Sequence, residues 1–438
     1  MKLNTKRTVL MGFAFFSICA FWQMYNSVIP LMLTNTFKMN ETISGAIMAI
    51  DNVLALFLLP LFGSISDRCN SKLGRRMPFI VFGTIGAVAL MMFLPMIDNS
   101  YAMSPEHWKL IAFVLVLLVL LVVMGIYRSP AVALMPDLTP KPLRSQANAI
   151  INLMGAIGGI TYLATAAIMY SPSKTQGLQH VNYMPIFAFV ALIMAISVAI
   201  VFITIKEPKL RAEVKQWEEA HPEADLSEKD ESGDEVLPAA VKRSLQFLLA
   251  SIFLWFVAYN AVMTWFTTYA NVEWNMALGQ ASKCLMVGNL GAIIAFIPIG
   301  KISEKIGRKK TILSGIIMMS ACFIAMCAWT YTGYGFSPVL FIFMALLGVG
   351  WASINVNSLP MVVEMCKGSD IGKFTGYYYT FSMAAQILSP ILAGWLMNHI
   401  SYDTLFIYGA IFAAASFITM KNVHHGDTIK EEIGRAHV

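Results

Sequence analysis

Charged side chains are scarce in this chain. Asp, Glu, Lys and Arg make up 13% of its 438 residues, whereas a soluble domain carries about 25%. Hydrophobic residues account for 57%. So few charges cannot cover the surface of a soluble protein of this size, which excludes a soluble enzyme. The same scarcity excludes a nucleic-acid-binding chain, so no nucleic acid partner is expected.

Residues that could form metal or catalytic sites are also sparse. The six Cys are scattered, without a CxxC pair and without His at metal-ligand spacing. That distribution argues against a disulfide framework and against a metal site. No phosphate-binding glycine loop or buried Ser-His-Asp set is visible. We therefore expect no enzyme activity, no cofactor and no direct use of ATP.

Long apolar runs dominate the sequence instead. A membrane-spanning helix needs about 20 largely apolar residues, and the runs do not alternate with the period of barrel strands. The sequence predicts an all-α membrane protein with twelve transmembrane helices, near 8–33, 43–66, 77–97, 109–135, 143–170, 184–205, 244–270, 279–302, 311–332, 337–363, 370–398 and 402–421.

The Lys and Arg distribution predicts the orientation. If the N-terminus is cytoplasmic, the segments on that side hold 26 of the 31 Lys and Arg residues. Because basic loops stay in the cytoplasm, we expect both termini to be cytoplasmic and the protein to lie in the plasma (cytoplasmic) membrane of the cell.

One polar stretch divides the chain into halves. Residues 206–242 carry eleven acidic and six basic side chains, which is typical of a solvated linker, with a short surface helix near 209–220. The predicted domains are an N-terminal six-helix bundle at 1–205 and a C-terminal one at 243–422. Residues 423–438 are expected to form a disordered tail, non-native in part because its end resembles a translated adapter.

The two halves repeat a loop pattern. An acidic residue at a helix end is followed by a glycine turn and a basic cluster, after the second and the eighth span, and an acid–base pair recurs after the fourth and the tenth. The residues are Gly63, Asp67, Arg68, Gly74, Arg75, Arg76, Asp137 and Arg144 in the first half, and Gly300, Glu304, Lys305, Gly307, Arg308, Glu364 and Lys373 in the second. Paired halves of this kind favour a transporter that rocks about a central site, with these charges as a cytoplasmic gate or, alternatively, only as loop anchors.

These loops resemble those of the major facilitator superfamily. The segments 66–80, 133–138 and 144–148 are similar to sucrose–proton symporters and to the glycoside–pentoside–hexuronide:cation symporters. The resemblance implies two pseudo-symmetric six-helix bundles and a cation-coupled sugar or glycoside porter. Those cation symporters often place carboxylates on the second helix where this chain has Ala55 and Leu59, so proton coupling is favoured over sodium. Uncoupled facilitation is the alternative to either.

Two charges fall well within predicted spans: Asp51 and Arg128. A charge at this depth costs several kcal/mol, and such residues usually mark a transport pathway. Asp51 is the candidate proton carrier. Arg128 can pair with Asp51, bind a substrate hydroxyl or carboxylate, or clamp helix carbonyls. A depth difference of about 10 Å along the helices argues against a permanent pair.

Uncharged polar and aromatic residues supply a candidate sugar cavity. A sugar needs amide and hydroxyl partners and an aromatic face, although such residues also serve helix packing. The candidates are Trp22, Gln23, Asn26, Asn152, Tyr259, Asn260, Thr264, Trp351, Asn355, Tyr378 and Gln386.

The sequence thus predicts a secondary active transporter that imports a mono- or disaccharide or a glycoside with protons by alternating access. An exporter or antiporter of another small solute is the first alternative. A membrane sensor or scaffold that does not transport is the second.

Overall fold

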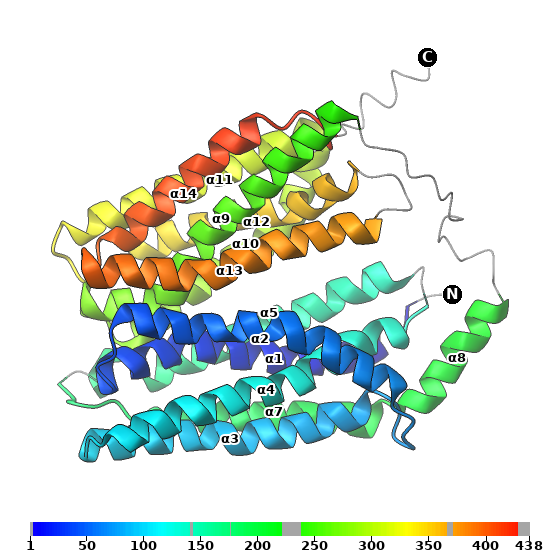
Figure 1. Ribbon diagram of the computed structural model, residues 1–438, viewed down its shortest axis with the longest axis horizontal. Coiled ribbons are helices and arrows are strands. Elements are labelled where there is room, and N and C mark those ends of the chain that lie inside the picture. The colour runs from blue at the N-terminus through cyan, green and yellow to red at the C-terminus, as the bar shows by residue number, and fades with distance from the viewer. Residues whose placement is uncertain (1–2, 141–142, 176, 221–237, 366–370, 428–438) are drawn as a thin grey trace. The chain divides into compact units, whose positions relative to one another are not determined.

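The structure, a computed structural model, describes residues 3–140, 143–175, 177–220, 238–365 and 371–427. Regular structure in these ranges is helical throughout (Figure 1). Twelve helices there are long and apolar enough to cross a membrane. This confirms the predicted fold class and the twelve predicted spans.

The helices extend beyond the apolar runs because a helix can project from the hydrocarbon into water. For example, the run predicted from 244 belongs to a helix that begins at Ala239. The elements are α1 (Thr5–Leu31), the π-helix η1 (Met32–Thr36), α2 (Glu41–Arg68), α3 (Met77–Met103), α4 (His107–Asp137), α5 (Arg144–Met169), α6 (Pro172–Thr175), α7 (Met184–Thr204), α8 (Glu207–Ala220), α9 (Ala239–Val272), α10 (Leu278–Ile306), α11 (Arg308–Thr330), α12 (Val339–Val363), α13 (Ile371–His399) and α14 (Thr404–Lys421). The short helix expected near 209–220 is α8.

Contacts divide the chain into two units. Unit 1 comprises residues 1–39 and 50–227, and unit 2 comprises residues 40–49 and 228–438. The first turns of α2 thus group with unit 2 and the remainder of that helix with unit 1.

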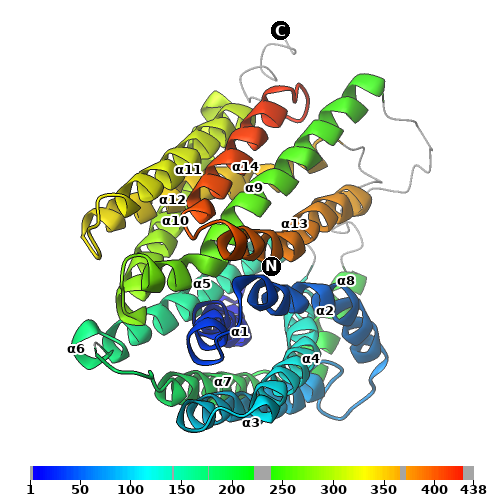
Figure 2. The same ribbon diagram turned by 60° about the vertical axis from the view of Figure 1, so that its left-hand side comes forward.

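The two units share four helix pairings. In unit 1, α1 packs on α5 and α7, and α3 packs on α4 and α7. In unit 2, α9 packs on α13 and α14, and α11 packs on α12 and α14. Figures 1 and 2 both show α3, α4 and α7 side by side, as they do α9, α11 and α14. The repeat seen in the loops therefore extends to the packing of whole helices.

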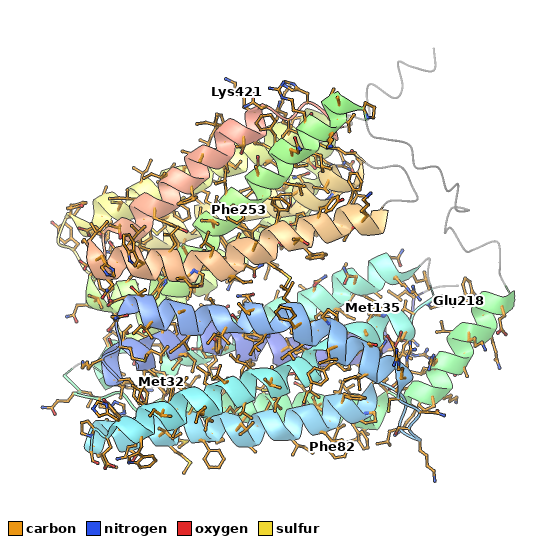
Figure 3. All side chains as sticks on the ribbon, in the orientation of Figure 1. Met32, Phe82, Met135, Glu218, Phe253 and Lys421 are labelled. Atoms are coloured by element: carbon orange, nitrogen blue, oxygen red, sulfur yellow. The ribbon has the colours of Figure 1, made fainter. Side chains whose placement is uncertain are left out.

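Apolar side chains cover the outside of these helices. Phe82 is 70% exposed and Ile297 is 73% exposed, and Figure 3 shows Phe82 on the outer surface of α3. Water would disfavour such a surface, whereas lipid solvates it. The helix exteriors are therefore suited to a bilayer.

Close packing within unit 2 depends on small residues. A Cβ on Gly348 of α12 would lie 2.0 Å from the carbonyl oxygen of Gly288 on α10. No real side chain tolerates that separation, so the two backbones meet because position 348 is glycine.

We expect Gly348→Ala to lower the apparent melting temperature in detergent, because overpacking of this kind costs about 1–3 kcal/mol. Gly376→Ala is the matched control, since a Cβ there meets nothing within 4 Å. Equal melting temperatures for the two variants would contradict the close α10–α12 approach.

Candidate functional site

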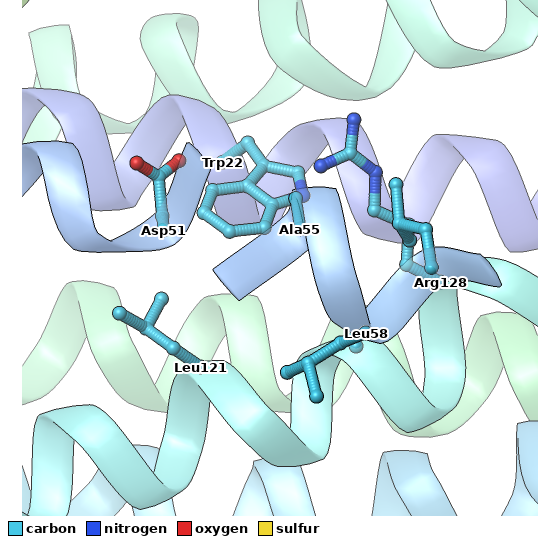
Figure 4. A pocket seen from close by; sticks show the side chains of 8 residues that line it. Trp22, Asp51, Ala55, Leu58, Leu121 and Arg128 are labelled. Atoms are coloured by element: carbon cyan, nitrogen blue, oxygen red, sulfur yellow. The ribbon is translucent and has the colours of Figure 1, made fainter. Parts of the chain in front are cut away.

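The two charges predicted to lie well within the spans line one small cavity in unit 1. Asp51 comes from α2 and Arg128 from α4, and Trp22 of α1 joins them. Apolar side chains complete the wall, including Leu58 and Leu121 (Figure 4). The enclosed space is about 10 Å³, enough for about one water molecule.

Trp22 lies between the two charges in Figure 4. The guanidinium carbon of Arg128 is 5.4 Å from the centre of a Trp22 ring, within the range of a cation–π interaction. One oxygen of Asp51 accepts a hydrogen bond from the side-chain amide of Asn52 at 2.9 Å. The indole N–H of Trp22 is buried and has no hydrogen-bond partner among the described residues.

Asp51 and Arg128 do not form a direct ion pair: no contact within 4.0 Å joins them among the ion pairs of the described chain. The sequence left three roles open for Arg128. The structure shows its guanidinium over an indole, facing the cavity that Asp51 also lines. Two opposite charges therefore share one apolar enclosure with a ring between them.

The other unit 1 candidates lie apart from this cavity. The side-chain oxygen of Gln23 faces Gly159 of α5. It would lie 3.9 Å from a Cβ atom added to that glycine. Asn26 and Asn152 are exposed on α1 and α5. The structure thus places Trp22 with the charges but does not bring the three amides to the same cavity.

Four aromatic residues form a cluster in unit 2, called here the aromatic cluster: Phe256, Tyr259, Trp351 and Tyr378. The rings of Tyr259 and Trp351 are parallel, with centroids 3.8 Å apart and planes 3° apart. Phe256 meets Trp351 edge-on at 5.2 Å and Tyr378 at 6.3 Å. The sequence identified three members and missed Phe256, because an apolar residue in a span gives no signal of its own.

The polar candidates around the aromatic cluster differ in their hydrogen bonding. The Asn260 side-chain N–H₂ is buried without a partner among the described residues. Gln386 donates to the Ser382 carbonyl at 3.2 Å on its own helix. Thr264 and Asn355 are half-buried. Asn260 is therefore the amide in this set with an unused buried donor.

At the end of unit 1 that carries the α2–α3 loop, four side chains form a charge cluster: Asp67, Arg75, Arg76 and Asp137. Arg75 binds Asp137 through two nitrogens, at 2.6 and 3.1 Å. Arg76 donates to Asp137 at 2.8 Å and also binds Asp67. Arg76 is only 4% exposed. The predicted loop charges thus converge into one network within unit 1.

The remaining unit 1 loop residues have separate contacts. Gly63 supplies a carbonyl oxygen to Arg76 at 3.2 Å. Arg144 donates to the carbonyl of Thr139 at 3.1 Å. Arg68 is exposed and is not a member of the charge cluster.

Unit 2 repeats the network in a simpler form. Arg308 forms an ion pair with Glu364. Glu304, Lys305 and Lys373 are exposed, and a side chain at Gly300 would meet nothing within 4 Å. The Arg308–Glu364 pair therefore lies in the second half where the first half has the charge cluster.

A carboxylate caps the helix that follows each of these loops. Glu207 accepts hydrogen bonds from the main-chain N–H groups of Arg75, Arg76 and Met77, at 2.8–3.1 Å. In unit 2, Asp427 accepts from the N–H of Arg308 at 2.6 Å. Such caps satisfy the unpaired N–H groups of a helix start and favour its positive dipole end.

A glycine with positive φ precedes each capped helix start. Gly74 has φ 111° and Gly307 has φ 93°, values that other residues rarely adopt. A Cβ on Gly74 would also lie 2.3 Å from the Glu207 carboxylate. Neither cap was predicted from the sequence, although one signal was available: an acidic residue soon after the last span of each half.

Metal-binding side chains do not gather in the described ranges. No group of three or more His, Cys, Asp or Glu residues there lies close enough to hold a metal ion.

Comparisons with known proteins identify the class. The family model described as Major Facilitator Superfamily matches residues 11–289 and 272–428. Sucrose transport protein SUC4 of Arabidopsis thaliana is 36% identical over 120 residues, 26% of this chain and 24% of that protein. The isoprimeverose transporter of Lactiplantibacillus pentosus is 22% identical over 304 residues, 68% of this chain and 59% of that protein. The chain thus matches less than two thirds of either relative.

A solved structure superposes on nearly the whole length of this chain. That structure is the xylose transporter XylE from E. coli in its inward-open conformation. The alignment covers 96% of each chain, at 15% identity and with a TM-score of 0.67. At that identity the likeness shows the fold alone.

The helices and these matches define an integral membrane transporter and not an enzyme. The chain belongs to the Major Facilitator Superfamily, because the family model spans far more than half of its length. This confirms the superfamily that the loop motifs predicted.

We expect Glu207→Ala to destabilise the protein by about 1–2 kcal/mol, because three main-chain N–H groups lose their acceptor. Glu207→Gln retains one carbonyl oxygen and should cost less. Thermal unfolding in detergent measures both effects. Glu219→Gln, at an exposed position of the same helix, is the control, and a Glu207→Ala protein as stable as that control would contradict the capping role.

Proposed function

We propose that this transporter imports a sugar or glycoside together with protons, by alternating access across the cytoplasmic membrane. One observation carries the proposal: a carboxylate and a guanidinium line the same apolar cavity with an indole between them. Isolated charges are costly inside hydrocarbon. A structural role alone would be served better by apolar side chains of similar size.

In this proposal Asp51 carries the proton. Its carboxylate has one side-chain amide partner, from Asn52, so protonation breaks no ion pair. Protonation removes a negative charge from the wall that Arg128 shares. The guanidinium then loses an attractive partner across the cavity and becomes available to a substrate hydroxyl or carboxylate, for which its planar fork is suited. Proton and substrate binding are coupled through this one change of charge.

Sugar as the substrate class rests on the aromatic and amide side chains. The C–H face of a sugar ring packs against aromatic rings, and its hydroxyls need amide partners. Tyr259 and Trp351 offer stacked rings, and Asn260 offers an unused buried donor. The names of the similar transporters refer to sucrose, isoprimeverose and xylose, which supports the same class.

The orientation follows from charge. The loops on the side of the chain termini hold most of the Lys and Arg residues, which supports a cytoplasmic position for that side. The charge cluster of unit 1 and the Arg308–Glu364 pair would then lie at the cytoplasmic ends of their units, as gate elements that open and close with the transport cycle.

Uptake into proteoliposomes tests the proposal. With an inward proton gradient, a panel of labelled mono- and disaccharides should yield at least one that accumulates above its external concentration. A protonophore should abolish the accumulation. A sugar that equilibrates across the membrane but never accumulates above its external concentration, whatever the gradient, would contradict proton coupling. Failure of every sugar with a correctly folded protein would contradict the substrate class.

Asp51→Asn should lose gradient-driven accumulation and retain part of the sugar exchange, because the amide keeps the shape of the side chain but cannot take up a proton. Accumulation and exchange are measured in the same vesicles. Asp403→Asn, at a half-buried position outside the spans, is the control. Undiminished accumulation by Asp51→Asn would remove Asp51 from the coupling role.

Arg128→Lys should weaken sugar binding about tenfold or more, because a lysine keeps the charge but loses the planar fork. Quenching of tryptophan fluorescence by the sugar measures the affinity. Arg68→Lys, on the exposed end of α2, should bind as the wild type does. Wild-type affinity in Arg128→Lys would instead assign Arg128 a packing role.

A further inference from the structure

A second, larger cavity lies in unit 1, between the α2–α3 loop and α8. Asn70 and Ser71 line it from the loop, and Arg211 and Lys215 line it from α8. Its volume is about 360 Å³, against about 10 Å³ for the cavity beside Trp22. It is therefore large enough for a small ligand or a lipid headgroup.

Helix α8 is held in place by its acidic and apolar residues. Its first residue, Glu207, caps α3, and Leu210 and Val214 are buried one turn apart. Glu213 lies 3.5 Å from Arg7 and Glu218 lies 3.8 Å from Arg144. Glu213 and Glu218 are thus matched by basic groups outside the cavity.

Two basic side chains of α8, Arg211 and Lys215, face the cavity without strong partners. Arg211 has no hydrogen bond or ion pair within the described part of the chain. Lys215 has one exposed contact, with Glu219 at 3.6 Å. Glu207 is the acid in the cavity wall. Each of its two carboxylate oxygens already accepts hydrogen bonds from main-chain N–H groups. The cavity therefore presents unpaired positive charge.

Neutral donors in the loop complete the set. The amide of Asn70 makes no hydrogen bond to the described residues. The Ser71 oxygen accepts from the N–H of Leu73 at 3.1 Å, which leaves its hydroxyl hydrogen free. A guanidinium, an ammonium, an amide and a hydroxyl around one space are the donors that a phosphate group requires.

We propose that this cavity binds a phosphate-bearing anion, either the headgroup of an anionic phospholipid or a soluble phosphate ester. The bound anion joins α8 to the α2–α3 loop, because its donors come from both. It also lies beside Arg75, which the charge cluster already holds. Binding therefore stabilises unit 1 at the end where that cluster lies, independently of the transported solute.

The experiment uses the full chain and two kinds of probe. In neutral detergent, the melting temperature is measured against inorganic phosphate and glycerol 3-phosphate, with sodium chloride at equal ionic strength as the salt control. In nanodiscs, the melting temperature with phosphatidylglycerol is compared with that with phosphatidylcholine, and bound lipid is counted by native mass spectrometry. A ligand that binds only the folded state raises the melting temperature.

The test variant is the double substitution Arg211→Gln with Lys215→Gln. Its matched control is Lys209→Gln, which removes one charge from the same helix at an exposed position outside the cavity wall. We expect the double variant to bind the active probe about tenfold or more weakly, since a charged hydrogen bond is lost at each position. Lys209→Gln should keep wild-type affinity.

The responses to the two kinds of probe distinguish the possible ligands. A response to both kinds of probe supports a general phosphate site. A response to phosphatidylglycerol alone supports a lipid headgroup, and a response to the soluble esters alone supports a metabolite. The proposal is overturned if no probe acts beyond the salt and phosphatidylcholine controls, or if Lys209→Gln and the double variant lose affinity equally.

Discussion

Hydrocarbon offers no hydrogen bonds, and this constraint governs the whole structure. Every backbone group inside a bilayer must find its partner within the protein, so the spans are helices. Helices in lipid gain little from burying apolar area and instead need close contact. The approach of Gly348 to Gly288 and the shared helix pairings of the two units follow from that need.

The same constraint makes helix ends important. The first N–H groups of a helix have no partner within it, and near a membrane surface a carboxylate is an effective acceptor. Glu207 and Asp427 perform this task in the two halves, each beside a glycine with positive φ. The caps connect the segment after the last span of each half to the start of its third span. Each cap is therefore a contact within one half of the chain.

Charges within the spans are the exception to the apolar rule, and the structure gives them unusual surroundings. Asp51 and Arg128 share a cavity without touching, and the indole of Trp22 lies between them. A direct ion pair would hold both groups in their charged forms, each as the partner of the other. In the proposed mechanism, separation by the indole leaves each charge free to change partners when a proton or a solute binds.

The sequence alone determined the class of this protein. Apolar runs of sufficient length predict spans because the bilayer thickness sets the length of a helix, and all twelve are found. The loop motifs predicted the superfamily, because an acid, a glycine and a basic cluster at fixed spacing are local features. The scarcity of charge likewise singled out Asp51 and Arg128.

Only the tertiary structure decided which side chains meet. No spacing along the chain shows that Trp22 comes between Asp51 and Arg128, because the three belong to different helices whose rotation is set by packing. Gln23, Asn26 and Asn152 looked equivalent to Trp22 in sequence, yet they do not line that cavity. The capping partners of α3 and α11 lie more than a hundred residues away in the chain, beyond the reach of any local pattern.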